Sequence, residues 1–220
     1  VDAFIGQPKS DGLSNFMVDP GKGDPDGIKF DMEGFGNQEI VLAQEDITEN
    51  IRAVQMQQGI RPVEHLEQLQ GVGTALTIEM ETGTGKTYTY IKTMFELNKQ
   101  YGWTKFVIVV PSIAIRDGVY KSFLSMEEHF ALEYGKRMQY FIYNSKQLAK
   151  IDSFASDPGI HVMIINTQAV NTSMNEDKNK EGRGGDNAAR IIFSRRDEFR
   201  SRRPIDILSA TRPIMIIDEP

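Results

Sequence analysis

The sequence predicts an α/β domain with a mostly parallel sheet flanked by helices. Three observations point to this fold class. From residue 76 onward, short runs rich in β-branched residues alternate with longer amphipathic stretches. The run Phe106–Val110 is apolar on both faces, as a buried parallel strand requires. A glycine-rich turn at 82–87 separates the first of these runs from the first long amphipathic stretch.

The N-terminal part of the chain differs in composition from the rest. Residues 1–37 contain many Gly, Pro, Asp and Ser residues and few apolar ones, so we expect a poorly structured segment. Asp46 or Thr48 can cap a helix that continues to about Gly59. The predicted domain covers residues 38–220.

The elements of the predicted domain follow from hydrophobic periodicity. The expected strands are Ala75–Met80, Lys105–Val110, Met138–Tyr143, His161–Asn166 and Pro213–Ile217. The expected helices between the first four strands are Lys86–Tyr101, about Ile113–Tyr134, and Lys146–Phe154.

Residues 171–189 contain almost no large apolar side chain, which predicts a mobile loop. Arg190–Arg203, which follows, is partly apolar and has the character of a short helix. Its arginines can grip phosphates or form the solvated face of that helix. We favour the solvated face, because Asp197 and Glu198 interrupt the cluster.

Composition excludes several classes of site. The 220 residues include no cysteine, which rules out disulfides, thiolate zinc sites and a cysteine nucleophile in this chain. The three histidines show no metal-ligand spacing. No apolar run is long enough to cross a bilayer and no signal peptide is apparent, so we expect a cytoplasmic protein without membrane association. The net charge of −6 argues against binding nucleic acid by bulk electrostatics.

Residues 80–87, Met-Glu-Thr-Gly-Thr-Gly-Lys-Thr, form a P-loop pattern. Such a loop needs glycines so that backbone N–H groups can approach phosphate oxygens, and a lysine to balance their charge. The expected ATP contacts are Thr82, Gly83, Thr84, Gly85, Lys86 and Thr87. Lys86 can reach the β- and γ-phosphates, and the Thr87 hydroxyl can bind Mg²⁺. Met80 departs from the general pattern, which has glycine there.

A second acidic motif fits the same chemistry. Ile214–Ile217 is an apolar strand that delivers Asp218 and Glu219 to its carboxyl end, where α/β sheets bind ligands. Asp218 would hold Mg²⁺, mainly through coordinated water, and Glu219 would polarise the water that attacks ATP. With Lys86, these are the candidate catalytic residues of an ATP hydrolase.

Other P-loop classes fit less well. A GTPase needs a guanine-reading Asn-Lys-x-Asp motif, which neither Asn175–Asp177 nor Asn179–Glu181 supplies. The Asp-Glu pair and the lack of a basic lid motif disfavour nucleotide kinases. A binding module that holds nucleotide or DNA without turnover remains a rival for this chain, since catalysis between two domains requires both.

Three segments resemble motifs I, Ia and II of superfamily 2 helicases, and most closely the Res subunit of type III restriction endonucleases. The segments are Glu79–Thr87, Phe106–Arg116 and Ile217–Pro220, the last reading Ile-Asp-Glu-Pro. The similarity covers about residues 45–220. It implies the first RecA-like domain of an ATP-dependent motor that acts on duplex DNA in a restriction-modification complex with a DNA-methyltransferase (Mod) subunit. Another superfamily 2 ATPase is the alternative.

The resemblance also suggests further contacts. Ser112, Arg116 and Thr167 lie where such motors touch the DNA backbone. Helix capping is the alternative role for Ser112 and Thr167, and a solvated charge for Arg116. Gln44, before the first helix, is the candidate adenine contact.

In the resembled fold, a second RecA-like domain with an arginine finger and a nuclease domain follow Pro220. The strand after motif II inserts between the P-loop strand and the motif II strand. We therefore expect a gap or an exposed edge in the sheet, with a disturbed C-terminal strand or pairing with another chain. We also expect these 220 residues alone to hydrolyse ATP weakly or not at all.

Overall fold

The computed structural model describes residues 1–10, 14–18, 32–66, 68–69, 73–167, 192 and 203–218. The chain divides into two compact units: Val1–Lys9 with Glu39–Tyr101, and Ser10–Gln38 with Gly102–Pro220. The loop predicted at 171–189 lies outside the described residues, as does most of the helix expected at 190–203.

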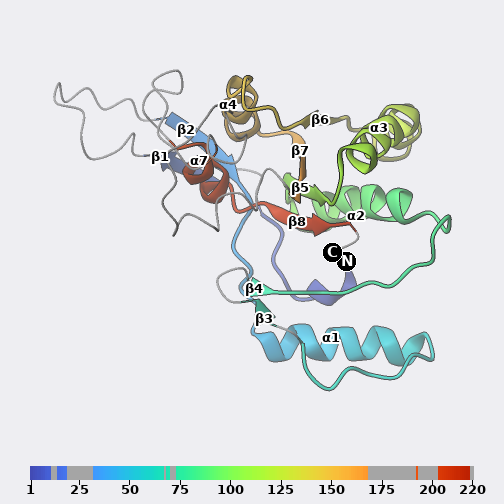
Figure 1. Ribbon diagram of the computed structural model, residues 1–220. Helices are drawn as coiled ribbons and strands as arrows, with labels where there is room; N and C mark the ends of the chain where they lie inside the picture. Colours follow the sequence, from blue (N-terminus) through green and yellow to red (C-terminus); the bar gives the residue numbers. More distant parts are fainter. Residues whose placement is uncertain are drawn as a thin grey trace, which may run out of the picture. The chain divides into compact units, whose positions relative to one another are not determined.

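The first unit contains two long helices, one on each side of the glycine-rich turn in sequence. The 3-10 helix η1 spans Asp2–Phe4, and helix α1 spans Gln44–Gln57. Strands β3 (Gln68–Leu69) and β4 (Gly73–Thr74) form a short antiparallel pair. Helix α2 covers Lys86–Tyr101, as predicted (Figure 1). Helix α1 begins at Gln44, earlier in the chain than the expected caps Asp46 and Thr48. The Asp46 carboxylate accepts the Ala43 N–H at 3.1 Å and so stabilises this earlier start.

Side-chain hydrogen bonds attach the first residues of the chain to this unit. The Asn50 amide donates to the carbonyls of Ala3 and Ile5, at 3.2 and 2.9 Å. The Tyr101 hydroxyl donates to the Val1 carbonyl at 3.3 Å, and the Tyr101 ring meets the Phe4 ring edge to face. These contacts order the first residues of a segment whose composition alone suggested little structure.

The second unit is built on a parallel sheet. The described strands are β5 (Lys105–Val110), β6 (Met138–Ile142), β7 (Ile160–Asn166) and β8 (Ile214–Ile217). They pair in the order β6-β7-β5-β8, and every pair is parallel (Figure 1). All six residues of β5 are buried, which confirms the predicted central strand. The predicted α/β class with a parallel sheet and flanking helices is confirmed.

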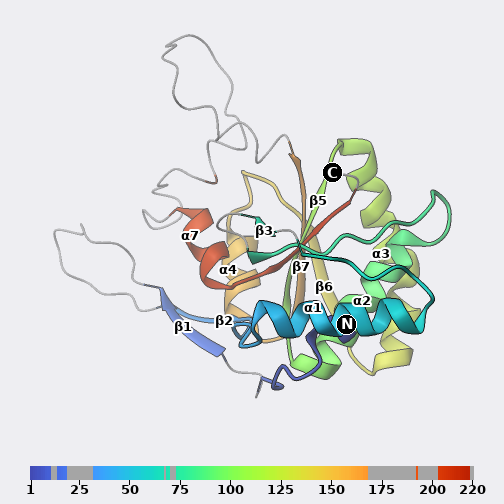
Figure 2. The same ribbon diagram turned by 90° about the horizontal axis from the view of Figure 1, so that it is seen from below.

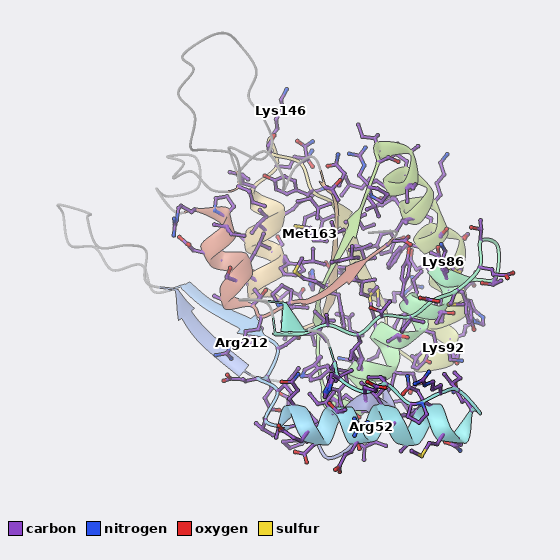
Figure 3. All side chains as sticks on the ribbon, turned by 60° about the horizontal axis from the view of Figure 1, so that its bottom comes forward. Arg52, Lys86, Lys92, Lys146, Met163 and Arg212 are labelled. Atoms are coloured by element: carbon purple, nitrogen blue, oxygen red, sulfur yellow. The ribbon has the colours of Figure 1, made fainter. Side chains whose placement is uncertain are left out.

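Helices cover both faces of this sheet (Figure 2). Helix α3 (Ile113–Tyr134) lies on one face, and helices α4 (Ala149–Ser156) and α7 (Pro204–Ala210) lie on the other. The core on the second face joins alternate residues of β5 and β7 to both helices, with Met163 of β7 near its centre (Figure 3). Among the described residues no helix is both long and apolar enough to span a bilayer.

A hairpin in the N-terminal segment belongs to the second unit. Strands β1 (Ser14–Val18) and β2 (Met32–Gly36) pair antiparallel beside α4 and α7. Gly36 packs directly on the chain after α7, where an added Cβ would lie 3.0 Å from the Thr211 carbonyl oxygen. A side chain at this position would therefore have to displace backbone atoms, which favours glycine.

The buried side chain of Asn37 joins three segments of the second unit. Its Oδ1 accepts hydrogen bonds from the N–H groups of Thr104 and Lys105, at 2.8 and 2.9 Å. Its Nδ2 donates to the carbonyls of Lys105 and Arg212, at 2.8 and 3.0 Å. Arg212 has a φ of 46°, a left-handed conformation that costs energy outside glycine. Asn37 thus ties the end of the hairpin to the start of β5 and to the α7–β8 connection.

A buried charged cluster lies at the amino ends of β5 and β7. The Lys105 ammonium donates to the carbonyls of Asp157 and Gly159 and lies 5.6 Å from the Phe154 ring centre. Burial lowers the pKa of Lys105 to about 8, against the opposing effect of the Asp157 carboxylate. His161 Nε2 lies 3.2 Å from Asp157 Oδ1. Burial and the Lys105 charge lower the pKa of His161, against the opposing effect of the Asp157 carboxylate.

Two expectations about the sheet differ from the structure. Residues 75–80 form no strand, and Ile78 is 74% exposed. A strand needs a ladder partner, and this segment has none among the described residues. The C-terminal strand, expected to be disturbed, is formed: β8 pairs with β5 and is an edge of the described sheet. The position of β8 agrees with the expected sheet edge, but the segment that lacks strand structure is the one before the P-loop. Pairing with another chain stays a prediction.

Candidate nucleotide and DNA sites

The glycine-rich loop has the backbone of a phosphate cradle. Gly83 and Gly85 have φ angles of 82° and 93°, which favour glycine. A Cβ built on either glycine meets no described atom within 4 Å, so the glycines face open space. The turn is closed by Thr84, whose N–H and hydroxyl both donate to the Glu81 carbonyl, at 3.3 and 2.6 Å. Thr82 lies within this turn. The loop is thus a tight, accessible turn with room for an anion.

The loop leads directly into helix α2. Lys86 is the first residue of α2 and Thr87 the second (Figure 3 labels Lys86). The Thr89 N–H bonds to the Gly85 carbonyl at 2.9 Å, which closes the first helical turn. The amides of a first turn have no carbonyl partner within their helix, and the helix dipole favours negative charge there. Residues and backbone therefore fit a bound polyphosphate, although the preceding strand is not formed.

Asp218 lies at the carboxyl edge of the parallel sheet. It directly follows β8, and its N–H bonds to the Val109 carbonyl at 2.9 Å, which continues the ladder between β8 and β5. This confirms that the strand delivers Asp218 to the edge where such sheets bind ligands. Glu219 lies outside the described residues. The described residues hold no cluster of three acidic or histidine side chains, but Mg²⁺ bound with nucleotide needs few protein ligands.

Two of the three DNA-contact candidates are engaged within the protein. Ser112 caps α3, because its hydroxyl oxygen accepts the Ile115 N–H at 3.3 Å. The Thr167 hydroxyl donates to the Pro111 carbonyl at 3.3 Å and so ties the end of β7 to the end of β5. Helix capping by Thr167 stays a prediction, because the residues that directly follow it lie outside the described part of the chain. These contacts bring Ser112 and Thr167 to the same sheet edge as Asp218, and contact with DNA stays a prediction.

Arg116 lies in the first turn of α3. Its Nε and Nη2 atoms donate to Asp117 Oδ1 at 3.0 and 2.9 Å, in an ion pair with its neighbour. Arginine has further N–H donors beyond those two atoms. Gln44 is the first residue of α1, and its backbone carbonyl accepts the Thr48 hydroxyl at 2.8 Å. Its contact with adenine stays a prediction.

A cleft that no sequence motif indicated lies at the same sheet edge. It has a volume of about 560 Å³ and lies where β6 and β7 end, beside the start of α3. The lining residues are Arg116, Tyr120, Tyr140, Phe141, Ile142, Tyr143, Asn144, Ser145, Gln147, Lys150 and Asn166. Asn144 and Asn166 follow the same rule as Asp218, because they are polar residues at the carboxyl ends of parallel strands. Tyr120 and Lys150 lie on helices, so this rule does not indicate them.

Comparison with known proteins identifies the family. The family model described as "Type III restriction enzyme, res subunit" matches residues 42–220. The EcoP15I Res subunit of Escherichia coli is 32% identical over 201 residues, covering 84% of this chain and 19% of the relative. The EcoPI Res subunit of Escherichia phage P1 is 32% identical over 196 residues, with the same two coverages.

The StyLTI Res subunit of Salmonella typhimurium is 33% identical over 166 residues, covering 66% of this chain and 15% of the relative. The chain therefore spans less than a fifth of the length of these relatives. The chain belongs to the family of type III restriction enzyme Res subunits.

Proposed function

We propose that this chain is the ATP-binding motor domain of a DNA-dependent ATPase that works in a type III restriction-modification enzyme. The observation that carries the proposal is the loop at 82–87, where two glycines in left-handed conformation lead into a helix that begins with Lys86. The family gives this loop its context, because its members are restriction enzyme subunits.

The residues take separate roles in ATP binding and hydrolysis. The backbone of residues 82–85 and the Lys86 ammonium would hold the phosphates, and the Thr87 hydroxyl would bind Mg²⁺. Asp218 would hold Mg²⁺, mainly through coordinated water. Glu219 would take the proton of the attacking water. Bound Mg²⁺ would neutralise the negative charge that develops on the phosphates.

The proposed partners follow from the family. The matched relatives are named as subunits of type III restriction-modification enzymes. Duplex DNA would be the track, and a DNA-methyltransferase (Mod) subunit would be the partner in the same complex. Ser112, Arg116 and Thr167 would contact the DNA backbone at the carboxyl edge of the sheet, where Ser112 and Thr167 also organise the loops.

ATP binding by the 220-residue chain is the first test. Isothermal titration with ATP and Mg²⁺ should show binding that Lys86→Ala abolishes. Lys99→Ala is the matched control, because Lys99 is exposed in the last turn of the same helix and pairs only loosely with Glu96, at 4.0 Å. Equal affinity of both variants for ATP would refute the assignment of the loop.

A further inference from the structure

The cleft at the ends of β6 and β7 combines features that neither the ATP site nor the backbone contacts require. Its volume of about 560 Å³ lies in the range of small-molecule sites, roughly 300–1,000 Å³. Its lining includes three tyrosines, two cations and three side-chain amides, but no carboxylate. This composition suits a ligand that is anionic at one end and flat and aromatic at the other.

The aromatic side of the cleft is held in place by neighbouring side chains. The Tyr120 ring of α3 meets the Tyr140 ring of β6 at an interplanar angle of 66°, with ring centres 5.5 Å apart. Tyr140 also packs against Phe123, at 5.0 Å. Its hydroxyl donates to Glu127 at 3.0 Å, and burial and that hydrogen bond raise the pKa of Tyr140 to about 12. A fixed aromatic surface loses little entropy when a planar ligand stacks on it.

The cations come from two different elements. Arg116 lies one helical turn before Tyr120 on α3, and Lys150 lies in the first turn of α4. The Arg116 ion pair with Asp117 uses Nε and Nη2, which leaves the Nη1 hydrogens for a ligand oxygen. Asn144 Oδ1 accepts the Lys146 N–H at 2.9 Å, so its NH₂ group can donate to a ligand. Amides of this kind can bond to the edge of a nucleobase.

We infer that this cleft binds one unpaired nucleotide of a DNA strand. The base stacks on the Tyr120–Tyr140 pair, the amides meet the base edge, and Arg116 and Lys150 hold the flanking phosphates. The inference rests on the proposed function for its ligand, since it assumes that the chain acts on DNA. Bases in an intact duplex are stacked on each other and cannot enter the cleft, so it discriminates an unpaired strand from a duplex.

The test measures binding of a fluorescein-labelled oligothymidylate of about 12 nucleotides by fluorescence anisotropy, without ATP. The comparison probe is an oligomer of equal length made of abasic sites, which has the same phosphates but no bases. Tyr120→Leu should weaken oligothymidylate binding about tenfold and leave binding of the abasic oligomer unchanged. Tyr120→Phe keeps the ring and should bind both probes like wild type.

Matched variants control for charge and for folding. Lys150→Gln should weaken binding of both probes by a similar factor, because it removes a phosphate contact. Lys146→Gln removes the same charge four residues away, where the side chain points away from the sheet (Figure 3), and should change neither. Tyr134→Leu replaces a tyrosine on α3 that does not line the cleft. Urea midpoints of all variants verify that they fold.

Three results would overturn the inference. They are an unchanged affinity of Tyr120→Leu for oligothymidylate, an equal loss in Tyr134→Leu, and competition by thymidine monophosphate as strong as that by the oligomer. The last would assign the cleft to a free nucleotide. Loss of the cleft inference would not change the result of the ATP titration with Lys86→Ala. If the chain does not bind ATP, the proposed motor function is refuted, but the cleft can still bind an unpaired nucleotide, so the two outcomes are distinguishable.

Discussion

The Asn37→Ala variant tests whether one buried amide holds the second unit together. Asn37 is 3% exposed, and its side chain makes four hydrogen bonds to backbone groups at the start of β5 and after α7. Alanine makes none of them. The N–H groups of Thr104 and Lys105 and the carbonyls of Lys105 and Arg212 then lose a partner.

The expected cost follows from those four groups. A buried polar group left unsatisfied costs about 1–3 kcal/mol. Four such groups would cost about 4–12 kcal/mol if all of them stayed unsatisfied. Water can enter the space vacated by the amide and satisfy some of them, so we expect a smaller total, about 2–4 kcal/mol. That is a large part of the roughly 5–15 kcal/mol that stabilise a typical domain. With a urea slope of about 2 kcal/mol per molar, the midpoint should fall by about 1–2 M.

Trp103 provides the assay. It is the only tryptophan of the 220 residues, and its side chain is 1% exposed. It belongs to the second unit and directly precedes Thr104 and Lys105, whose N–H groups donate to Asn37. Its fluorescence during urea unfolding reports on that unit. Asn144→Ala is the control, because Asn144 is exposed and makes one local hydrogen bond, and its midpoint should hardly move. A midpoint for Asn37→Ala as high as that of the control would refute this account of the amide.

Variants at three further positions test separate features. Ser112→Ala should lower unfolding free energy by about 1 kcal/mol in urea titrations, and Ser112→Asp should restore the helix cap while it weakens DNA binding in anisotropy assays by repelling phosphate. Gly85→Ala, which places a Cβ on a residue with φ of 93°, should cost about 1–2 kcal/mol of backbone strain and lower ATP affinity in calorimetry. The folded-state pKa of Lys105, about 8, lies below its ordinary value of 10.5, so the unfolded chain binds the extra proton between these values. Urea midpoints should therefore rise with pH from about 8 to 10, and Lys105→Met should abolish that rise.

The central helices and strands were predictable because burial and periodicity act locally there. Helix α2, strand β5 and helix α3 have the predicted bounds. Their patterns are long, and α3 also has clear end signals, Ser112 before it and Gly135 in the left-handed conformation after it. The end of β8 and the position of Asp218 were predictable because an apolar run is followed directly by an acidic residue.

Elements that depend on distant partners were not predictable. Strands β1 and β2 pair across a long connection, and their composition gives no register. Helix α7 has seven residues, too few for a clear period, although Pro204 at its start is a typical helix signal. Residues 75–80 have the composition of a strand but lack a ladder partner. The four hydrogen bonds of Asn37 join segments far apart in sequence, and no local pattern indicates them.

We propose that the loop at 82–87 and the acids at 218–219 serve an ATPase that responds to DNA. The direct measurement is ATP hydrolysis, with and without duplex DNA, by a chimaera in which this chain replaces the matching segment of the EcoP15I Res subunit. We expect hydrolysis that duplex DNA stimulates, loss of both binding and hydrolysis in Lys86→Ala, and loss of hydrolysis with ATP binding retained in Glu219→Gln. Hydrolysis that does not respond to DNA, or an equal loss of ATP binding in both variants, would refute these roles.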